Sequence, residues 1–109
     1  SLAAKVDAIY LPTDNTVAST ASTIGEILQE AKVPAMGSDA AVIDATLFTY
    51  GVDYHAIGVQ AGELAVKILK GDKPADLPVE KPNTAAVTVN EEMATALGFD
   101  AETIKALEK

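Results

Sequence analysis

The sequence predicts an α/β fold: an open, mainly parallel sheet in three layers, with helices on both faces. Short apolar stretches rich in β-branched residues alternate along the chain with longer stretches of helical period. The short stretches are almost continuously apolar, which is typical of strands buried on both faces of a parallel sheet. Each connection between them is long enough for a helix, so right-handed βαβ crossovers are expected.

The first half of the chain predicts three strands and two helices. Residues 1–5 resemble the last turn of a helix, and a strand over 6–12 ends at Pro12, which has no amide hydrogen to donate to a central ladder. A helix is predicted over 16–32, because one stripe of it is apolar: Val17, Ala21, Ile24, Leu28 and Ala31. The next elements expected are a strand over 33–37, a short helix over 38–46 and a strand that begins at Leu47 and ends at Gly51.

The second half predicts a long helix, a connector, a strand and two short helices. The helix over 53–70 ends before Gly71 and is apolar on more than one side, so it requires partners on two sides. Three prolines in residues 72–82 indicate an extended connector. A strand follows over 85–89. Asn90 and Asp100 are expected to cap the last two helices, and Gly98 to end the first of them after Leu97.

Composition narrows the possible functions. The chain has 109 residues, a net charge of −8, 49% apolar residues and no cysteine. This length corresponds to one small domain or a piece of a larger one. The negative charge argues against nucleic acid and anionic membranes as partners. With no thiolate ligand available and His55 as the single histidine, neither a metal site nor a cofactor is expected.

Polar residues follow each of the first three predicted strands. Because the carboxyl ends of parallel strands meet at one edge of the sheet, these residues are expected to form a ligand site: Thr13, Asp14, Asn15, Ser38, Asp39, Tyr50, Gly51 and Asp53. Such a set suits a small zwitterion with an apolar or aromatic side chain. Asp14 or Asp39 would pair with its ammonium group, and backbone amides at the following helix starts would bind its carboxylate.

Each of these residues also has a simpler interpretation. Asp14, Asn15, Ser38 and Asp39 are all good helix caps, and Tyr50 can pack at a strand end. The chain lacks a GxSxG elbow, a GxxxxGK[ST] phosphate loop and a GxGxxG turn, so it is not expected to be an enzyme.

Four segments, "VDAIYLPTDNTVAS", "VPAMGSD", "TYGVDYHAIGVQAGELAVKILKG" and "VTVNEEMATALGF", resemble the ABC-transporter substrate-binding proteins of the tryptophan/tyrosine type. These proteins have the type I periplasmic-binding fold, in which two α/β lobes close on a ligand. The resemblance implies that residues 1–109 are a partial substrate-binding domain, mostly the C-terminal lobe. Residues 53–82 would cross to the N-terminal lobe.

The resemblance also implies a role for the site residues. Asp14, Asn15 and Asp39 would contact the ligand, while Tyr50, Gly51 and Asp53 would lie near the hinge. The protein would be the solute-binding component of an ABC importer, with a small molecule, an aromatic amino acid, as ligand and an ABC permease as partner.

On the same resemblance the protein would be extracytoplasmic, either periplasmic or lipid-anchored at the outer face of the cell membrane. The alternative is the effector-binding domain of a transcription regulator with the same fold. Because the helix over 53–70 would lack its native lobe, the chain is also expected to form a homodimer or to swap this helix between copies.

Overall fold

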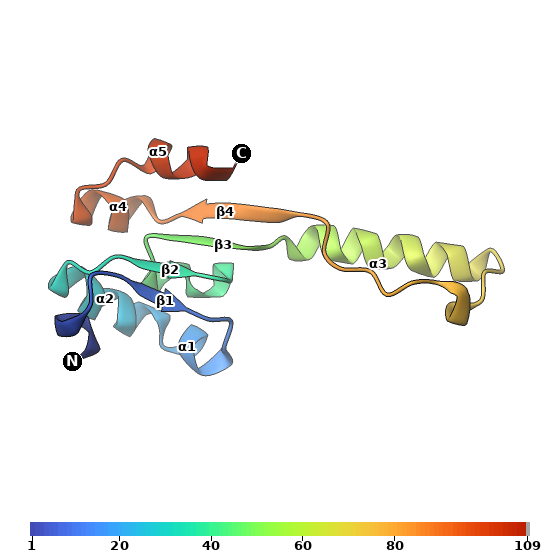
Figure 1. Ribbon diagram of the computed structural model, residues 1–109, viewed down its shortest axis with the longest axis horizontal. Helices are drawn as coiled ribbons and strands as arrows, with labels where there is room; N and C mark the ends of the chain where they lie inside the picture. Colours follow the sequence, from blue (N-terminus) through green and yellow to red (C-terminus); the bar gives the residue numbers. More distant parts are fainter. Residues whose placement is uncertain (109) are drawn as a thin grey trace. The chain divides into compact units, whose positions relative to one another are not determined.

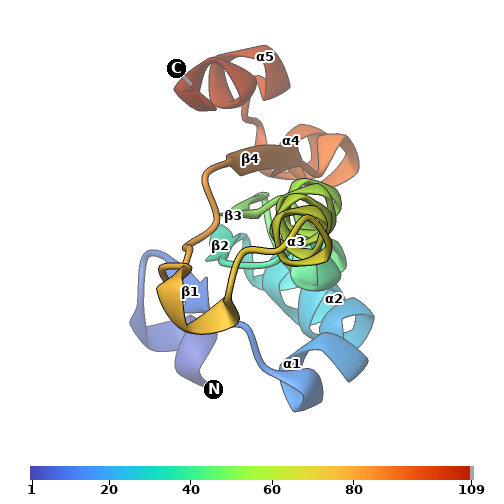
Figure 2. The ribbon, with the colours of Figure 1, turned by 90° about the vertical axis from the view of Figure 1, so that its right-hand side faces the viewer.

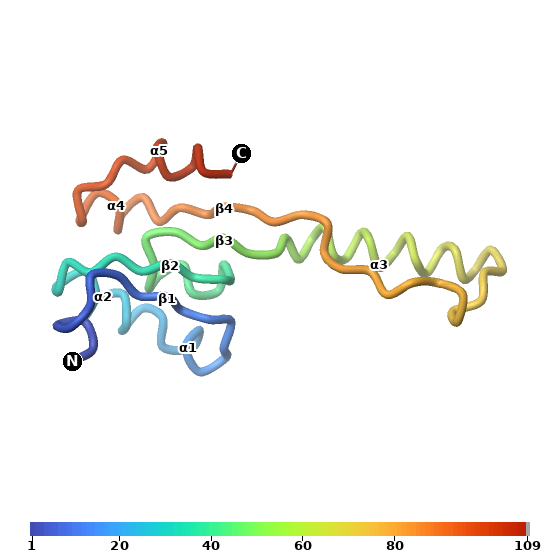
Figure 3. The backbone as a smooth tube through the Cα atoms, viewed as in Figure 1, coloured from blue at the N-terminus to red at the C-terminus, as the bar shows by residue number. Residues whose placement is uncertain are grey.

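The computed structural model describes residues 1–108, which divide into two compact units. The first unit contains Ser1–Gly51 together with the chain from Ala86 onward, and the second is Val52–Ala85. Figure 1 shows the helices and strands of both units, and the backbone tube in Figure 3 follows the chain from the first unit into the second and back. No helix within residues 1–108 has the combination of length and apolar character that a membrane span requires.

A four-stranded sheet has the order β1-β2-β3-β4. Its strands are β1 (Ile9–Leu11), β2 (Ala35–Gly37), β3 (Phe48–Val52) and β4 (Ala85–Val89). The first three are parallel, with Tyr10 paired to Met36 and Met36 to Phe48. The amide of Asn90, just after β4, donates to the carbonyl of Leu47, just before β3, at 3.0 Å, so β4 runs in the opposite direction. The sheet is therefore mixed, and mainly parallel.

Helices of the first unit pack on this sheet: η1 (Leu2–Lys5), α1 (Asn15–Ser19), α2 (Ala21–Ala31), η2 (Ala40–Ala45), α4 (Glu91–Leu97), α5 (Ala101–Lys105) and η4 (Ala106–Glu108). The view along the strands places α1 and α2 on one side of the sheet (Figure 2). This arrangement confirms the predicted α/β fold. Successive residues of a strand point to opposite faces of the sheet, and Tyr10 of β1 points to the face that α1 and α2 do not cover. Tyr10 is 60% exposed.

Two apolar clusters form the core of the first unit. One joins η1 and α2 to the sheet through four buried residues: Ala3, Leu28, Val33 and Ala35. The other consists of Leu47, Ala94 and Ile104, with Phe48 and Val89 packed against it. In the two clusters, residues from the start, middle and end of the chain pack within the first unit, and the burial of their apolar surface stabilises it.

The helix predicted over 16–32 is wrong in one respect, because the structure divides it at Thr20. The hydroxyl of Thr20 donates to the carbonyl of Thr16 at 2.9 Å, and the hydroxyl of Ser19 donates to the same carbonyl at 2.9 Å. Such side-chain bonds compete with the helical ladder. The apolar stripe continued across the break, which is why periodicity alone indicated one helix.

Caps and stops elsewhere agree with the sequence. Asn90 and Asp100 accept from the amides of Met93 and Thr103, at 3.0 and 3.1 Å. Gly98 has a φ of 81°, the left-handed geometry that favours glycine after a helix. The short helix predicted over 38–46 is the 3₁₀ helix η2, capped by Asp39.

The second unit consists of α3 (Tyr54–Leu69), η3 (Pro74–Asp76) and the segment that leads to β4. Helix α3 is followed by Gly71 with a φ of 113°, as the sequence predicts. The side chain of Gln60 donates to the carboxylate of Glu80 at 2.8 Å and to the carbonyl of Lys81 at 3.0 Å, which fixes the returning segment to one side of α3. Within residues 52–85, all of which are described, no side chain is buried.

Candidate functional site at the carboxyl ends of the parallel strands

The ends of β1 and β2 are held together directly. Leu11 pairs with Gly37, and the amide of Ser38 donates to the carbonyl of Leu11 at 3.1 Å. One residue beyond Pro12, the hydroxyl of Thr13 lies 2.9 Å from the hydroxyl of Ser38. Two of the predicted polar segments therefore meet at one edge of the sheet, called here the strand-end rim: residues 13–15, 38–39 and 50–51.

The end of β3 reaches the same rim through Gly51. A Cβ atom on Gly51 would collide with the carbonyl oxygen of Ser38 and lie 3.4 Å from the Cα of Asp39. Glycine is required here because the backbone of β3 passes directly against the β2–η2 turn. The sequence indicated Gly51 as a residue near the ligand. In the structure it sets how closely the third strand approaches the second.

Asp14 begins α1 and belongs to the rim. Its Oδ1 accepts from the amides of Thr16 and Val17 at 2.8 and 2.9 Å. This is the expected geometry of an N-cap, and Asn15 follows as the first residue of the helix. We expected the amides at this helix start to bind a ligand carboxylate. That expectation is wrong for these two amides, because the Asp14 side chain already accepts from them.

Asp39 is the buried carboxylate of the rim, with 9% of its surface exposed. Its Oδ1 accepts from the amide of Ala41 at 2.8 Å at the start of η2. Removing a carboxylate from water is costly unless hydrogen bonds or a cation compensate, so a buried aspartate at a sheet edge is a chemically distinctive group. Tyr50 of β3 is half exposed, while its neighbour Thr49 is buried on the opposite face.

Asp53 lies in the second unit, whereas the other seven predicted site residues lie in the first. Its Oδ1 accepts from the amides of His55 and Ala56 at 2.9 and 3.2 Å, so it caps α3. The structure thus brings Thr13 and Ser38 into contact and places Asp14, Asn15, Asp39, Tyr50 and Gly51 along the same rim. It gives Asp53 a capping role in a separate unit.

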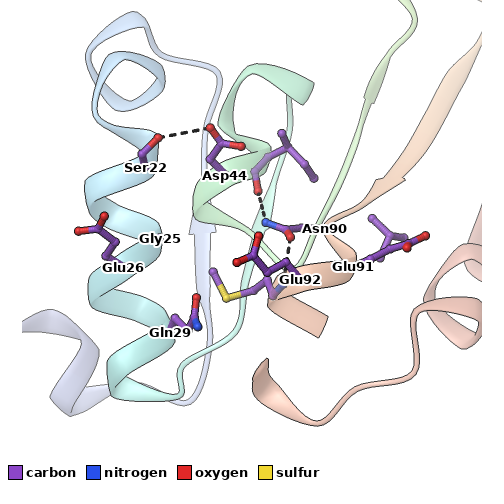
Figure 4. Close-up of a pocket in the computed structure, with 11 residues that line it drawn as sticks. Ser22, Gly25, Glu26, Gln29, Asp44, Asn90, Glu91 and Glu92 are labelled. Carbon is purple, nitrogen blue, oxygen red and sulfur yellow. Dashed lines mark hydrogen bonds between the residues drawn. The ribbon is translucent and has the colours of Figure 1, made fainter. Parts of the chain in front are cut away.

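Sequence reasoning missed a hollow of about 430 Å³ between α2, η2 and the start of α4. The side chain of Asn90 crosses this region, donating to the carbonyl of Ile43 at 3.1 Å, and Ser22 donates to Asp44 at 3.3 Å (Figure 4). Glu26 and Glu91 point away from one another in this view. Lys105, 2.8 Å from Glu91, holds the pKa of that carboxyl below its usual value.

The lining of this hollow comes from three separate parts of the sequence, so periodicity gave no signal for it. Asn90, which lines it, was predicted only as a helix cap. The bonds that Asn90 and Ser22 make join secondary-structure elements to one another. The hollow is therefore part of the packing between α2, η2 and α4, away from the strand-end rim.

Among residues 1–108, no group of three or more histidine, aspartate or glutamate side chains is placed to hold a metal ion. The rim instead offers hydroxyls, carboxylates and an aromatic face. An open α/β sheet with polar strand ends of this kind is typical of proteins that bind a small solute.

Comparison with known proteins identifies the class. The family model described as "ABC transporter substrate binding protein" matches residues 1–105, so this chain belongs to that family. Over 98 residues it is 35% identical to a protein of Clostridioides difficile (strain R20291) named "Tyrosine-binding protein". The match covers 89% of this chain and 28% of that relative, so the chain spans less than a third of the relative's length.

Two solved structures are similar over most of the chain. One is the ligand-free, open structure of a substrate-binding protein with adhesive properties from Clostridium difficile. It has a TM-score of 0.79 and 36% identity, over 91% of this chain and 34% of that one. The other is an ABC domain in complex with L-Trp from Streptococcus pneumoniae, with a TM-score of 0.75 and 36% identity, over 98% and 37% of the two chains.

Proposed function

We propose that this chain is part of the solute-binding component of an ABC importer and that its ligand is an aromatic amino acid. The observation that carries the proposal is the strand-end rim, where Thr13 and Ser38 are hydrogen-bonded beside the buried carboxylate of Asp39. The family match supports the transport role over that of a regulator's effector domain. The names of two relatives, one tyrosine-binding and one in complex with L-Trp, support the ligand class.

In the proposed complex the ligand binds against the rim, between two lobes. The carboxylates of Asp14 and Asp39 attract the ligand's ammonium group, and the ring of Tyr50 offers a face for its aromatic side chain. Most of residues 1–109 belong to the C-terminal lobe. Within this range, residues 53–82 are the segment that crosses to the N-terminal lobe. The division of the chain at Val52 and Ala85 supports this assignment. Closure of the two lobes removes water from the ligand, and the closed form docks on the permease.

The site of action follows from the same proposal. A protein that hands a solute to an importer works outside the cytoplasm, in the periplasm or anchored by lipid to the outer face of the cell membrane. The protein acts by binding and releasing the solute, without catalysis.

Calorimetric titration of the full-length protein against the twenty amino acids tests the ligand class. We expect saturable heat with tryptophan, tyrosine or phenylalanine, and much weaker heat with small or charged amino acids. The absence of heat with all three aromatic amino acids would reject the proposed ligand.

The rim itself is tested by Asp39→Asn in the full-length protein. Losing the buried negative charge should weaken binding of the ammonium group by about tenfold or more, equivalent to about 1.4 kcal/mol. The matched control is Asp100→Asn, because Asp100 is also an aspartate N-cap but begins α5, away from the rim. Equal affinity in the Asp39 variant and the control would show that Asp39 does not bind the ligand's ammonium group.

A further inference from the structure

The hydroxyls of Thr13 and Ser38, called here the hydroxyl pair, leave one donor unused at the strand-end rim. Their oxygens lie 2.9 Å apart, and neither has a second partner among residues 1–108. The two hydroxyls carry two protons, and the bond between them uses one. The pair therefore keeps one O–H that can donate to another molecule. That O–H is a stronger donor because its oxygen accepts a hydrogen bond from the other hydroxyl.

The usual donors for a ligand carboxylate, the amides at helix starts, are occupied at this rim. Asp14 and Asp39 cap α1 and η2, and five amides donate to these two residues: Thr16, Val17, Ala18, Ala41 and Val42. Residues 13–15, 38–39 and 50–51 also include no lysine, arginine or histidine. A carboxylate bound at the rim would therefore depend on neutral side-chain donors.

The hydroxyl pair is close in sequence to both aspartates that would attract the ligand's ammonium group. In an α-amino acid the ammonium and carboxylate groups are attached to the same carbon atom, so they bind to neighbouring groups of a protein. Thr13 directly precedes Asp14, and Ser38 directly precedes Asp39. Asn15, another neutral donor, adjoins Asp14 alone. Whichever aspartate attracts the ammonium group, a hydroxyl of the pair is one residue away.

Backbone contacts hold the hydroxyl pair in place, although Thr13 is exposed and Ser38 is only half-buried. The amide of Ser38 donates to the carbonyl of Leu11 at 3.1 Å, two residues before Thr13. The carbonyl oxygen of Ser38 lies where a Cβ atom on Gly51 would collide with it. Because these contacts already fix the backbone around the pair, little ordering is required when a ligand binds, which favours affinity.

We propose that the hydroxyl pair donates to the carboxylate of the bound amino acid and makes the rim specific for a free α-amino acid over the corresponding amine. A hydrogen bond to a carboxylate is charge-assisted, whereas an amine without a carboxylate offers the pair no acceptor. This inference rests on the proposed function, because it assigns a further role within the same ligand site.

Calorimetric titration of the full-length protein with two pairs of ligands tests the proposal: tryptophan with tryptamine, and tyrosine with tyramine. Each amine keeps the ring and the ammonium group of its amino acid but lacks the carboxylate. Thr13→Val combined with Ser38→Ala removes both hydroxyls and should weaken binding of the amino acids by about tenfold or more. The affinity for the amines should not change, since they have no group that the hydroxyls would bind.

Two further variants separate the hydroxyls from the shape of the rim. Thr13→Ser combined with Ser38→Ala restores one hydroxyl and should recover part of the lost affinity for the amino acids. Thr95→Val is the matched control, because the hydroxyl of Thr95 donates to the carbonyl of Glu91 at 2.9 Å within α4, away from the rim. This control should bind the amino acids and the amines like the unaltered protein.

The outcomes distinguish this inference from the proposed function. If the valine–alanine variant binds tryptophan and tyrosine as tightly as the unaltered protein does, the hydroxyl pair does not bind the carboxylate, and only this inference is wrong. Equal losses for an amino acid and its amine would mean that the hydroxyls only support the shape of the rim, which also overturns it. If no aromatic amino acid binds the unaltered protein, the proposed function itself is wrong, and this inference fails with it.

Discussion

At the scale of single residues, Gly25 shows how closely α2 packs on η2. A Cβ atom at this position would collide with the carbonyl oxygen of Asp44. Backbone cannot move away as a flexible side chain can, so Gly25→Ala should lower the free energy of unfolding by about 1–3 kcal/mol. Urea denaturation followed by circular dichroism measures this change.

Gly58→Ala is the control for the Gly25 variant. This glycine is also in a helix, but nothing lies within 4 Å of its missing Cβ. Alanine there should be neutral or raise the free energy of unfolding by about 0.4–1 kcal/mol, because it reduces the freedom of the unfolded chain. If both variants are equally stable, α2 and η2 are less tightly packed than the structure indicates.

Asp100 makes a pH-dependent contribution to stability. Hydrogen bonds from the hydroxyl and amide of Thr103 hold the pKa of this exposed carboxyl below its ordinary value of 3.8. Since the folded pKa is lower than the unfolded one, the stabilisation is fully present above the unfolded value. It is lost as the pH falls through the folded value.

The corresponding variant is Asp100→Asn, which cannot titrate. Carboxyl groups titrate between about pH 5 and about pH 2. Over this range we expect the urea midpoint of the unaltered chain to fall more steeply than that of the variant. The two curves should converge at the acid end. Parallel curves over the whole range would contradict the assigned role of Asp100.

At the scale of elements, Asn90 connects β4, α4 and η2. Its Oδ1 accepts from the amide of Met93, and its Nδ2 donates to the carbonyl of Ile43, 47 residues earlier in the chain. Asn90→Ala removes a helix cap and a tertiary bond and should lower the free energy of unfolding by about 1–3 kcal/mol.

Asn90→Asp separates the two contributions. Aspartate keeps the cap but has no Nδ2 donor, so the carbonyl of Ile43 loses its bond. We expect its stability, measured by urea denaturation, to lie between those of the unaltered chain and Asn90→Ala. A variant as stable as the unaltered chain would mean that the bond to Ile43 contributes nothing.

At the scale of the whole molecule, the two units should differ in their local stability. Among the described residues, the first unit contains both buried apolar clusters, whereas residues 52–85 have no buried side chain. Few buried contacts mean a low free energy of local opening. In dilute solution, hydrogen exchange measured by mass spectrometry should therefore be faster in α3 than in α2. Equal protection of the two helices would contradict this.

The order of strands and helices could be predicted from the sequence because it depends on local chemistry. Apolar periodicity indicated each strand and the long helix, and Asp39, Asn90, Asp100, Gly71 and Gly98 marked helix ends through their own backbone and side-chain preferences. The break at Thr20 was missed because the hydroxyl–carbonyl bonds that favour it do not disturb the apolar pattern.

The sequence by itself determined the fold class and the set of polar residues that follow the strands, since both depend on residue type and spacing. The tertiary structure alone decided which of those residues meet. It set Thr13 against Ser38, pressed Gly51 onto the β2–η2 turn and buried Asp39, while Asp53 became a cap in the second unit. The physical reason is that strand pairing and packing join residues far apart in the chain, and local propensity carries no information about those contacts.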